Sequence, residues 1–144
     1  MGMFGAIDAA ASGLTAERLR LDVISNNIAN ANTTRTAEGG PYRRQMVVFE
    51  PRAKTNAFSQ MLAREMDPGQ GVRVVGITKD ESPFKMVYDP SHPDANQDGY
   101  VEMPNINIVA EMVDMITATR AYEANVTAVN SAKSMAMKAL DIGR

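Results

Sequence analysis

The sequence predicts a mainly α-helical protein with a small β insert. Long N- and C-terminal helices pair as a coiled coil, and the segment between them is rich in β-hairpins. Apolar residues repeat in steps of three and four at both ends of the chain, all 7 prolines lie between residues 41 and 104, and short β-type runs separate those prolines. We therefore expect residues 1–31 and 105–144 to form a helical coiled-coil domain, and residues 32–104 to form a loop and hairpin insert.

The N-terminal helix is expected from Met3 to about Ala31. Positions 3, 7, 10, 14, 17, 21, 24 and 28 alternate in steps of four and three, and seven of these eight are apolar. A heptad stripe of this kind is typical of a helix that packs against another helix. The candidate packing residues on the stripe are Leu14, Leu21, Ile24 and Ile28.

The insert is expected to hold four short strands. Runs of β-type residues span 43–50, 72–78, 84–88 and 100–103, and glycine or proline separates them. They predict a small antiparallel sheet or two hairpins. Residues 52–70 are polar and end in glycine, so we expect a loop there.

The C-terminal helix is expected over residues 107–141, with Asn107 as its N-cap and Gly143 where it stops. Seven of the nine positions 112, 115, 119, 122, 126, 129, 133, 136 and 140 are apolar. The two stripes can pair with each other. The alanine-rich faces of both helices indicate neighbouring subunits, although alanine is also common in helices for its propensity alone. The candidate packing residues here are Met112, Met115, Tyr122, Val126 and Val129.

Composition excludes several kinds of chemistry. The chain has no cysteine and one histidine, His92, which lies between two prolines and is interpreted as a turn residue. The formal charge of -2 has no block of one sign, so neither nucleic acid nor a membrane surface is an expected partner. No phosphate-binding or nucleophile motif occurs. We expect no enzyme activity, no cofactor and no metal.

One stretch imitates a calcium loop. Residues 94–99, "DANQDG", match the first half of an EF-hand, but position twelve is Asn105 rather than a bidentate carboxylate. Flanking prolines also interrupt the entering helix. We interpret the stretch as an Asx-rich turn.

The N-terminus does not resemble a leader. It lacks a basic n-region, and Asp8 interrupts the apolar run. No run of 18 apolar residues occurs in the sequence, so no transmembrane helix is expected. If the protein leaves the cytoplasm, we expect export without leader cleavage.

Four asparagines crowd the end of the first helix, in "SNNIANANT" at residues 25–33. Asparagine is common where helices end. A helix end with Asn32 in a left-handed conformation would account for the asparagines at positions 30 and 32. Asn26 and Asn27, however, fall inside the last turns. Interfacial amides can fix the register between adjacent helices, so a fixed-register assembly is the functional interpretation. On this basis Asn27→Ala and Asn30→Ala would impair assembly more than folding.

Both ends of the chain resemble a known family. "LTAERLRLDVISNNIANANTTRT" is similar to the N-terminal signature of the bacterial flagellar rod and hook proteins, and "GYVEMPNINIVAEMVDMITATRAYEANVTAVNSAKSMAMKAL" to their C-terminal signature. "PYRRQMVVFE" and "MVYDPSHPDANQDGYVEMPN" narrow the resemblance to the short proximal rod members. The signature positions that match include Asn26, Asn27, Asn30, Glu111, Arg120, Tyr122, Glu123 and Asn125.

The resemblance implies a structural subunit of the flagellar basal-body rod. Such proteins assemble helically into the drive shaft, which transmits torque and encloses the export channel. The implied partners are copies of the chain, other rod proteins, the MS-ring and export-gate base, and the flagellar type III export apparatus. The implied location is the basal body, in the periplasmic space or between membrane and cell wall.

Two alternatives differ in class. A secreted coiled-coil interaction protein would share the helix pattern, but a helical hairpin needs only a short loop, and the β-rich insert speaks against it. A small metal-dependent enzyme built on "HPDANQD" would need His92, Asp94 and Asp98 to converge on one ion.

Overall fold

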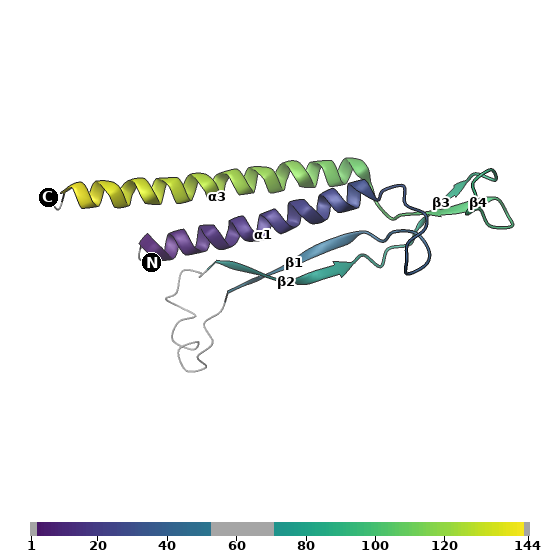
Figure 1. The fold of residues 1–144 in the computed structure, drawn as a ribbon, viewed down its shortest axis with the longest axis horizontal. Coiled ribbons are helices and arrows are strands. Elements are labelled where there is room, and N and C mark those ends of the chain that lie inside the picture. The colour runs from purple at the N-terminus through teal and green to yellow at the C-terminus, as the bar shows by residue number, and fades with distance from the viewer. Residues whose placement is uncertain (1–2, 53–70, 143–144) are drawn as a thin grey trace, which may run out of the picture. The chain divides into compact units, whose positions relative to one another are not determined.

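The computed structural model describes residues 3–52 and 71–142 (Figure 1). The described elements are α1 (Met3–Ala29), β1 (Gln45–Pro51), β2 (Val72–Lys79), β3 (Lys85–Tyr88), β4 (Tyr100–Met103) and α3 (Ile108–Ile142). The predicted mainly helical fold with a β insert is confirmed, and every strand lies within two residues of its predicted bounds. The predicted 52–70 loop, beyond Arg52, and the predicted stop at Gly143 lie outside the described residues.

The four strands form two separate pairs. Strand β1 pairs with β2, and β3 pairs antiparallel with β4, with Tyr88 opposite Tyr100. The rings of these two tyrosines meet edge to face, with centroids 5.2 Å apart. Such cross-strand aromatic pairs stabilise a hairpin that has little other packing. Of the two predicted arrangements, two hairpin-like pairs rather than one sheet are therefore observed.

Helix α3 starts at the predicted cap. The side-chain Oδ1 of Asn107 accepts hydrogen bonds from the backbone N–H groups of Val109 (3.1 Å) and Ala110 (3.4 Å). Its own carbonyl accepts the first helical bond, from Glu111 (3.0 Å). At the end of α1 the left-handed residue considered for Asn32 is not found, because in the described ranges only glycines have positive φ.

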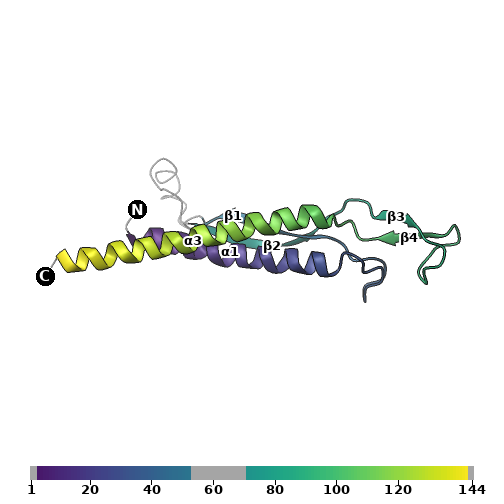
Figure 2. The same cartoon turned by 90° about the horizontal axis from the view of Figure 1, so that it is seen from above.

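The described residues fall into two compact units. The first comprises Met1–Leu19, Val48–Gly76 and Ala118–Arg144, apart from the residues not described. The second comprises Arg20–Val47 and Ile77–Thr117. In the first unit, small residues pack α1 against α3: Ala16, Ala118 and Ala132 are buried. A Cβ atom on Gly13 would come within 2.8 Å of the Asn125 amide nitrogen, so the two helices approach closely there. In this unit α3 continues past the N-terminus of α1 (Figures 1 and 2).

In the second unit the end of α1 lies beside the start of α3. Its core combines apolar and polar side chains, and the most buried members are Val23, Ile24, Asn27, Val101, Ile106 and Glu111. Strand β1, of which residues 45–47 belong to this unit, alternates between half-buried and exposed residues, as expected of a strand with one covered face.

The predicted stripe on α3 is half right. Positions 115, 122, 126, 129 and 136 are half-buried as expected. Positions 112, 119, 133 and 140 are exposed, and the buried residues 111, 118 and 132 lie one residue before three of them. Met112 and Leu140 are instead 54% and 70% exposed. The shift arises because Glu111, Ala118 and Ala132 occupy the seam, and a count of large apolar residues overlooks them.

Candidate assembly site

Asn27 is the centre of a buried polar cluster in the second unit. Its side chain is 1% exposed and makes hydrogen bonds in three directions. Nδ2 donates to the carbonyl of Gln45 (2.9 Å), while Oδ1 accepts from the backbone N–H of Gln45 (3.0 Å). Oδ1 also accepts from the Tyr42 hydroxyl (3.3 Å). The amide therefore pairs with the start of β1 as a neighbouring strand would, and fixes α1 to it.

Glu111 joins α3 to the same cluster. Its side chain is 1% exposed, and its Oε2 accepts a second bond from Asn27 Nδ2 (3.0 Å). Its Oε1 accepts from Arg44 Nε at 2.6 Å. A buried carboxylate is costly unless it is paired and hydrogen-bonded, and here both of its oxygens are satisfied. One side chain from each of α1, α3 and the chain entering β1 thus meets at this point.

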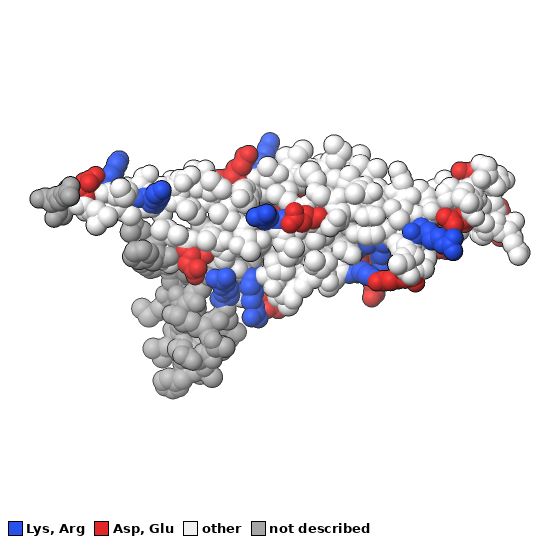
Figure 3. Space-filling model, viewed as in Figure 1, with Lys and Arg blue, Asp and Glu red and all other residues white. Residues whose placement is uncertain are grey.

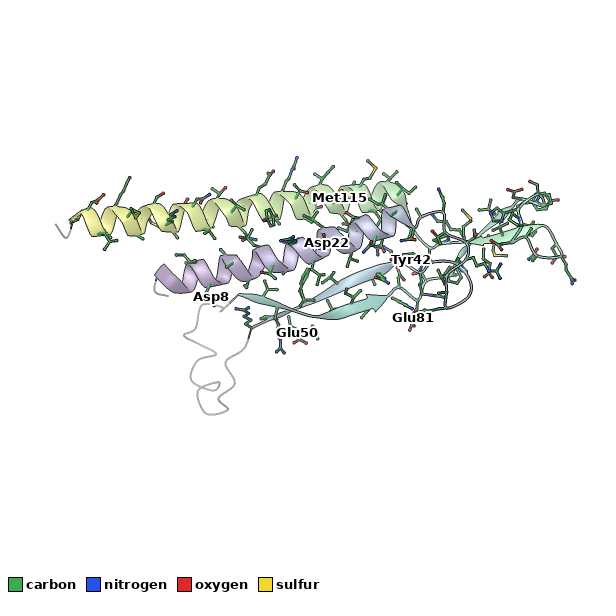
Figure 4. The ribbon with its side chains drawn as sticks, in the orientation of Figure 1. Asp8, Asp22, Tyr42, Glu50, Glu81 and Met115 are labelled. Atoms are coloured by element: carbon green, nitrogen blue, oxygen red, sulfur yellow. The ribbon has the colours of Figure 1, made fainter. Side chains whose placement is uncertain are left out.

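Arg44 lies at the acidic side of the cluster. Its guanidinium is 3.4 Å from Asp114 Oδ2 and 3.7 Å from Asp80 Oδ2, in addition to its bond with Glu111. Burial opposes the charge of Arg44, but the Glu111 hydrogen bond and the three negative charges outweigh it and raise its pKa. Burial, and then the charge of Glu111, raise the pKa of Tyr42. Figure 4 labels Tyr42 beside the end of α1.

Asn105 orders the backbone around the cluster. Its Oδ1 accepts from the backbone N–H of Arg44 (2.9 Å), and its Nδ2 donates to the carbonyls of Asp80 (3.1 Å) and Ser82 (3.2 Å). Asn105, which occupies position twelve of the apparent calcium loop, therefore has a structural role. It ties together the chain before β1, the chain after β2 and the entry to α3.

The asparagines of the first helix have different surroundings. Asn26 is exposed, and Asn30 is half-buried with its Nδ2 donating to the carbonyl of Asn26 (2.9 Å). Asn30 Oδ1 accepts from the Thr33 hydroxyl (3.1 Å), which closes the turn after the helix. Of these three asparagines, Asn27 is the one whose side chain bonds to distant parts of the chain. The run of asparagines therefore consists of one buried core amide and neighbours whose amides bond locally or face solvent at the end of the helix.

The predicted packing residues divide by exposure. Ile24 and Asn27 are buried, so the structure gives both a role inside the chain. Nine of the predicted packing residues are half-buried: Leu14, Leu21, Ile28, Asn30, Met115, Tyr122, Asn125, Val126 and Val129. Those left exposed, and able to meet a neighbour directly, are Asn26, Met112, Arg120 and Glu123. Met115 is labelled on α3 in Figure 4.

Sequence reasoning missed an open apolar face on α3. Val109, Val113 and Ile116 are 71%, 59% and 55% exposed and lie on the same side as Met112. Their spacing of three and four residues is a stripe in its own right, next to the predicted one. In Figure 3 the upper edge over the start of α3 is white, and red and blue side chains appear toward the middle of the helix. Exposed apolar patches of this kind mark interaction surfaces.

The first unit has its own fixed point, also missed. The hydroxyl of Ser12 on α1 accepts from the backbone N–H of Val72 (3.0 Å) and donates to the carbonyl of Ala9 (2.7 Å). Gly71, with φ of 91°, brings β2 so close to α1 that a side chain there would meet Ser12 and Ala9. The sequence signal was a serine in an apolar helix face and a glycine directly before a strand.

The 89–99 segment is the expected turn. Asn96 Oδ1 accepts from the backbone N–H groups of Asp98 (3.0 Å) and Tyr100 (2.8 Å), and His92 Nδ1 accepts from that of Asp94 (3.1 Å). Asp94 also accepts a bond from the Thr34 hydroxyl (2.9 Å). Within residues 3–52 and 71–142, no three His, Asp or Glu side chains are grouped to hold a metal ion. None of the described helices is long and apolar enough to cross a membrane.

Comparison with known proteins identifies the family. A family model described as "flagella basal body rod protein" matches residues 7–35, and one described as "flagellar basal body rod FlgEFG protein C-terminal" matches residues 97–142. The chain is 56% identical to the flagellar basal-body rod protein FlgC of Borreliella burgdorferi, over 99% of this chain and 98% of that protein. It is 49% identical to FlgC of Bacillus subtilis and 39% identical to FlgC of Escherichia coli O6:H1, in each case over the whole of both chains. These are structural proteins rather than enzymes. The chain belongs to the flagellar basal-body rod protein family.

Proposed function

We propose that the protein is a subunit of the proximal rod that assembles helically into the drive shaft. In this role it transmits torque and encloses the export channel. The observation that carries the proposal is the uncovered apolar side of α3, because large exposed apolar residues on a long helix need neighbouring subunits. The terminal segments 1–31 and 105–144 would form the shaft, and residues 32–104 would be the insert around it.

Pairing of the terminal helices as an antiparallel coiled coil is part of the proposal. In the first unit Gly13 lies against Asn125, and in the second Asn27 bonds to Glu111. The residue numbers in each pair add up to 138, as expected of two antiparallel helices that keep one register. Half-buried positions at heptad spacing on both helices support the same arrangement.

The proposed partners are copies of the chain, other rod proteins, the MS-ring and export-gate base, and the type III export apparatus that would deliver the chain. The proposed location is the rod, in the periplasmic space or between membrane and cell wall. A torque-bearing subunit must resist shear between its segments. The Asn27–Glu111–Arg44 cluster supports such a role, since it joins both helices to β1 through directional bonds.

The test is an in-frame deletion in the source bacterium, with electron microscopy of its basal bodies and a swimming assay. We expect rings without a rod, no filaments and no swimming, all restored by the wild-type chain on a plasmid. Complete, rotating flagella in the deletion strain would overturn the proposal. A secreted coiled-coil interaction protein would then be the better interpretation.

A further inference from the structure

Met46 lies against the guanidinium that neutralises the buried carboxylate of Glu111. Arg44 Nη1 donates a hydrogen bond to Met46 Sδ at 3.2 Å, while Arg44 Nε donates to Glu111 Oε1 at 2.6 Å. Arg44 and Met46 are two positions apart at the entry to β1, so their side chains leave the chain on the same side. All three residues belong to the second unit, so the contact lies within one compact part of the chain.

The sulfur of Met46 can be reached from solvent, although the carboxylate behind Arg44 cannot. Met46 is 38% exposed, whereas the Arg44 side chain is 24% exposed and the Glu111 side chain 1%. An exposed methionine is open to oxidation to the sulfoxide, a modification that reductases reverse. A small oxidant therefore reaches this sulfur without first opening the buried cluster.

Oxidation changes the Met46 side chain from a weak hydrogen-bond acceptor into a strong one. A thioether sulfur accepts weakly, whereas a sulfoxide is polar and presents a partly negative oxygen. The sulfur has two lone pairs, and Arg44 engages one of them. Hydrogen peroxide can transfer an oxygen atom to the other. The S–O bond forms, the O–O bond breaks, and sulfur gives up two electrons. The proton on the transferred oxygen passes to the departing hydroxide, which leaves as water.

The new oxygen would meet a part of the guanidinium that Glu111 does not use. Glu111 is bound by Nε, whereas Nη1 bonds to Met46 and lies 3.7 Å from Asp80 Oδ2. The sulfoxide oxygen can therefore replace the sulfur as acceptor without displacing Glu111, and the three rotatable bonds of the side chain allow the adjustment. Hydrogen bonds from a charged donor are stronger than those between neutral groups. A firmer hold on Arg44 keeps the cation in place beside Glu111.

We propose that Met46 is a reversible oxidation site, and that its sulfoxide binds Arg44 and strengthens the Asn27–Glu111–Arg44 cluster. The oxidant is a peroxide, and methionine sulfoxide reductases restore the thioether. The site couples the redox conditions around the protein to the stability of the region in which α1, α3 and the entry to β1 are joined. This inference does not depend on the proposed rod function.

The test measures urea unfolding of the purified full-length chain before and after treatment with hydrogen peroxide. Met46→Leu is the matched control, because every other methionine is oxidised alike in both proteins. The difference between their two oxidation-induced shifts therefore isolates Met46. We expect oxidation to raise the wild-type midpoint by about 0.3–1 M relative to its effect on Met46→Leu, and sulfoxide reductases to reverse that difference. Peptide mass spectrometry shows whether Met46 itself has gained an oxygen atom.

Two further variants identify the partner of the oxygen. In Arg44→Leu the contribution of Met46 to the oxidation-induced shift should be lost. Met46→Gln gives a readout that needs neither peroxide nor a folded Arg44 variant, because its amide oxygen is an uncharged acceptor on a side chain of similar length. Its midpoint should exceed that of Met46→Leu by more than Met86→Gln exceeds Met86→Leu, since Met86 is another exposed methionine on a strand.

Several results would overturn the proposal. One is an equal oxidation-induced shift in wild type and Met46→Leu, and another is a Met46-dependent shift to lower urea. A Met46-dependent rise that persists in Arg44→Leu would show that the sulfoxide acts through a different group. Met46 that stays unoxidised while the 52% exposed Met86 is fully converted would show that the site is closed to peroxide.

Discussion

Replacing Asn27 tests whether the buried polar cluster of Asn27, Glu111 and Arg44 stabilises the folded chain. Asn27→Ala removes two bonds with Gln45 and one from the half-buried Tyr42 hydroxyl, each contributing about 1 kcal/mol or less, and one to the Glu111 carboxylate, contributing about 1.5–3 kcal/mol. Water can reach the half-buried Gln45 and recover part of this, and alanine improves helix propensity by about 0.5 kcal/mol. We therefore expect a net loss of about 3 kcal/mol in the free energy of unfolding.

The assay is urea unfolding of the purified full-length chain, followed by circular dichroism. With slopes of about 1–3 kcal/mol/M, the midpoint should fall by about 1–3 M with no change in slope. Asn26→Ala is the matched control: it alters the neighbouring exposed amide and should stay within about 0.5 kcal/mol of wild type. If the two variants unfolded at the same urea concentration, the cluster would not stabilise the fold. The sequence alone led us to expect that Asn27→Ala would impair assembly more than folding. Because Asn27 is buried inside the chain, we now expect its main effect on folding.

Three further outcomes are expected. Gly71→Ala should destabilise the chain by about 1–3 kcal/mol more than Gly39→Ala. Both residues have φ near +90°, so the backbone cost is shared, but only at Gly71 would a Cβ clash with α1. Equal melting temperatures of the two variants would contradict this. Arg44→Met should lower the free energy of unfolding by about 3 kcal/mol, because it leaves Glu111 buried without its cation. The double variant Arg44→Met, Glu111→Met should lose less than the sum of the two single variants. Strict additivity in urea unfolding would argue against a coupled pair. Hydrogen bonds from Ser82 lower the pKa of Asp80, so the ionised carboxylate stabilises the fold above about pH 3.9, and this stabilisation is lost as pH falls further. Asp80→Asn should therefore narrow the difference in melting temperature between pH 7 and pH 3. An unchanged difference would refute this.

The elements could be predicted from sequence because their signals are local. Heptad spacing indicated both helices, the cap at Asn107 was recognisable from its position after Pro104, and the bounds of β4 matched those predicted. Alternating half-buried and exposed residues in β1 follow the ordinary strand pattern. None of these inferences needs knowledge of which distant residues meet.

The cluster could not be predicted in the same way. Asn27, Arg44 and Glu111 lie far apart in sequence, and each alone resembles a surface residue. The seam of α3 was misplaced by one residue for a related reason. Close helix approach selects alanine and glycine, which contribute little to an apolar count, while the larger Met112 lies on the open side.

The contacts of α1 with α3, Gly13 with Asn125 and Asn27 with Glu111, also affect the order of folding. Helix α1 finds its partners Glu111 and Asn125 only when the last part of the chain is available. Contacts of such long sequence separation form slowly, because a long loop must close before they stabilise anything. A nascent chain on the ribosome would therefore keep its N-terminal segment unpaired until synthesis is nearly finished. That delay lengthens the period in which a chaperone or a secretion machine can engage the chain before it folds.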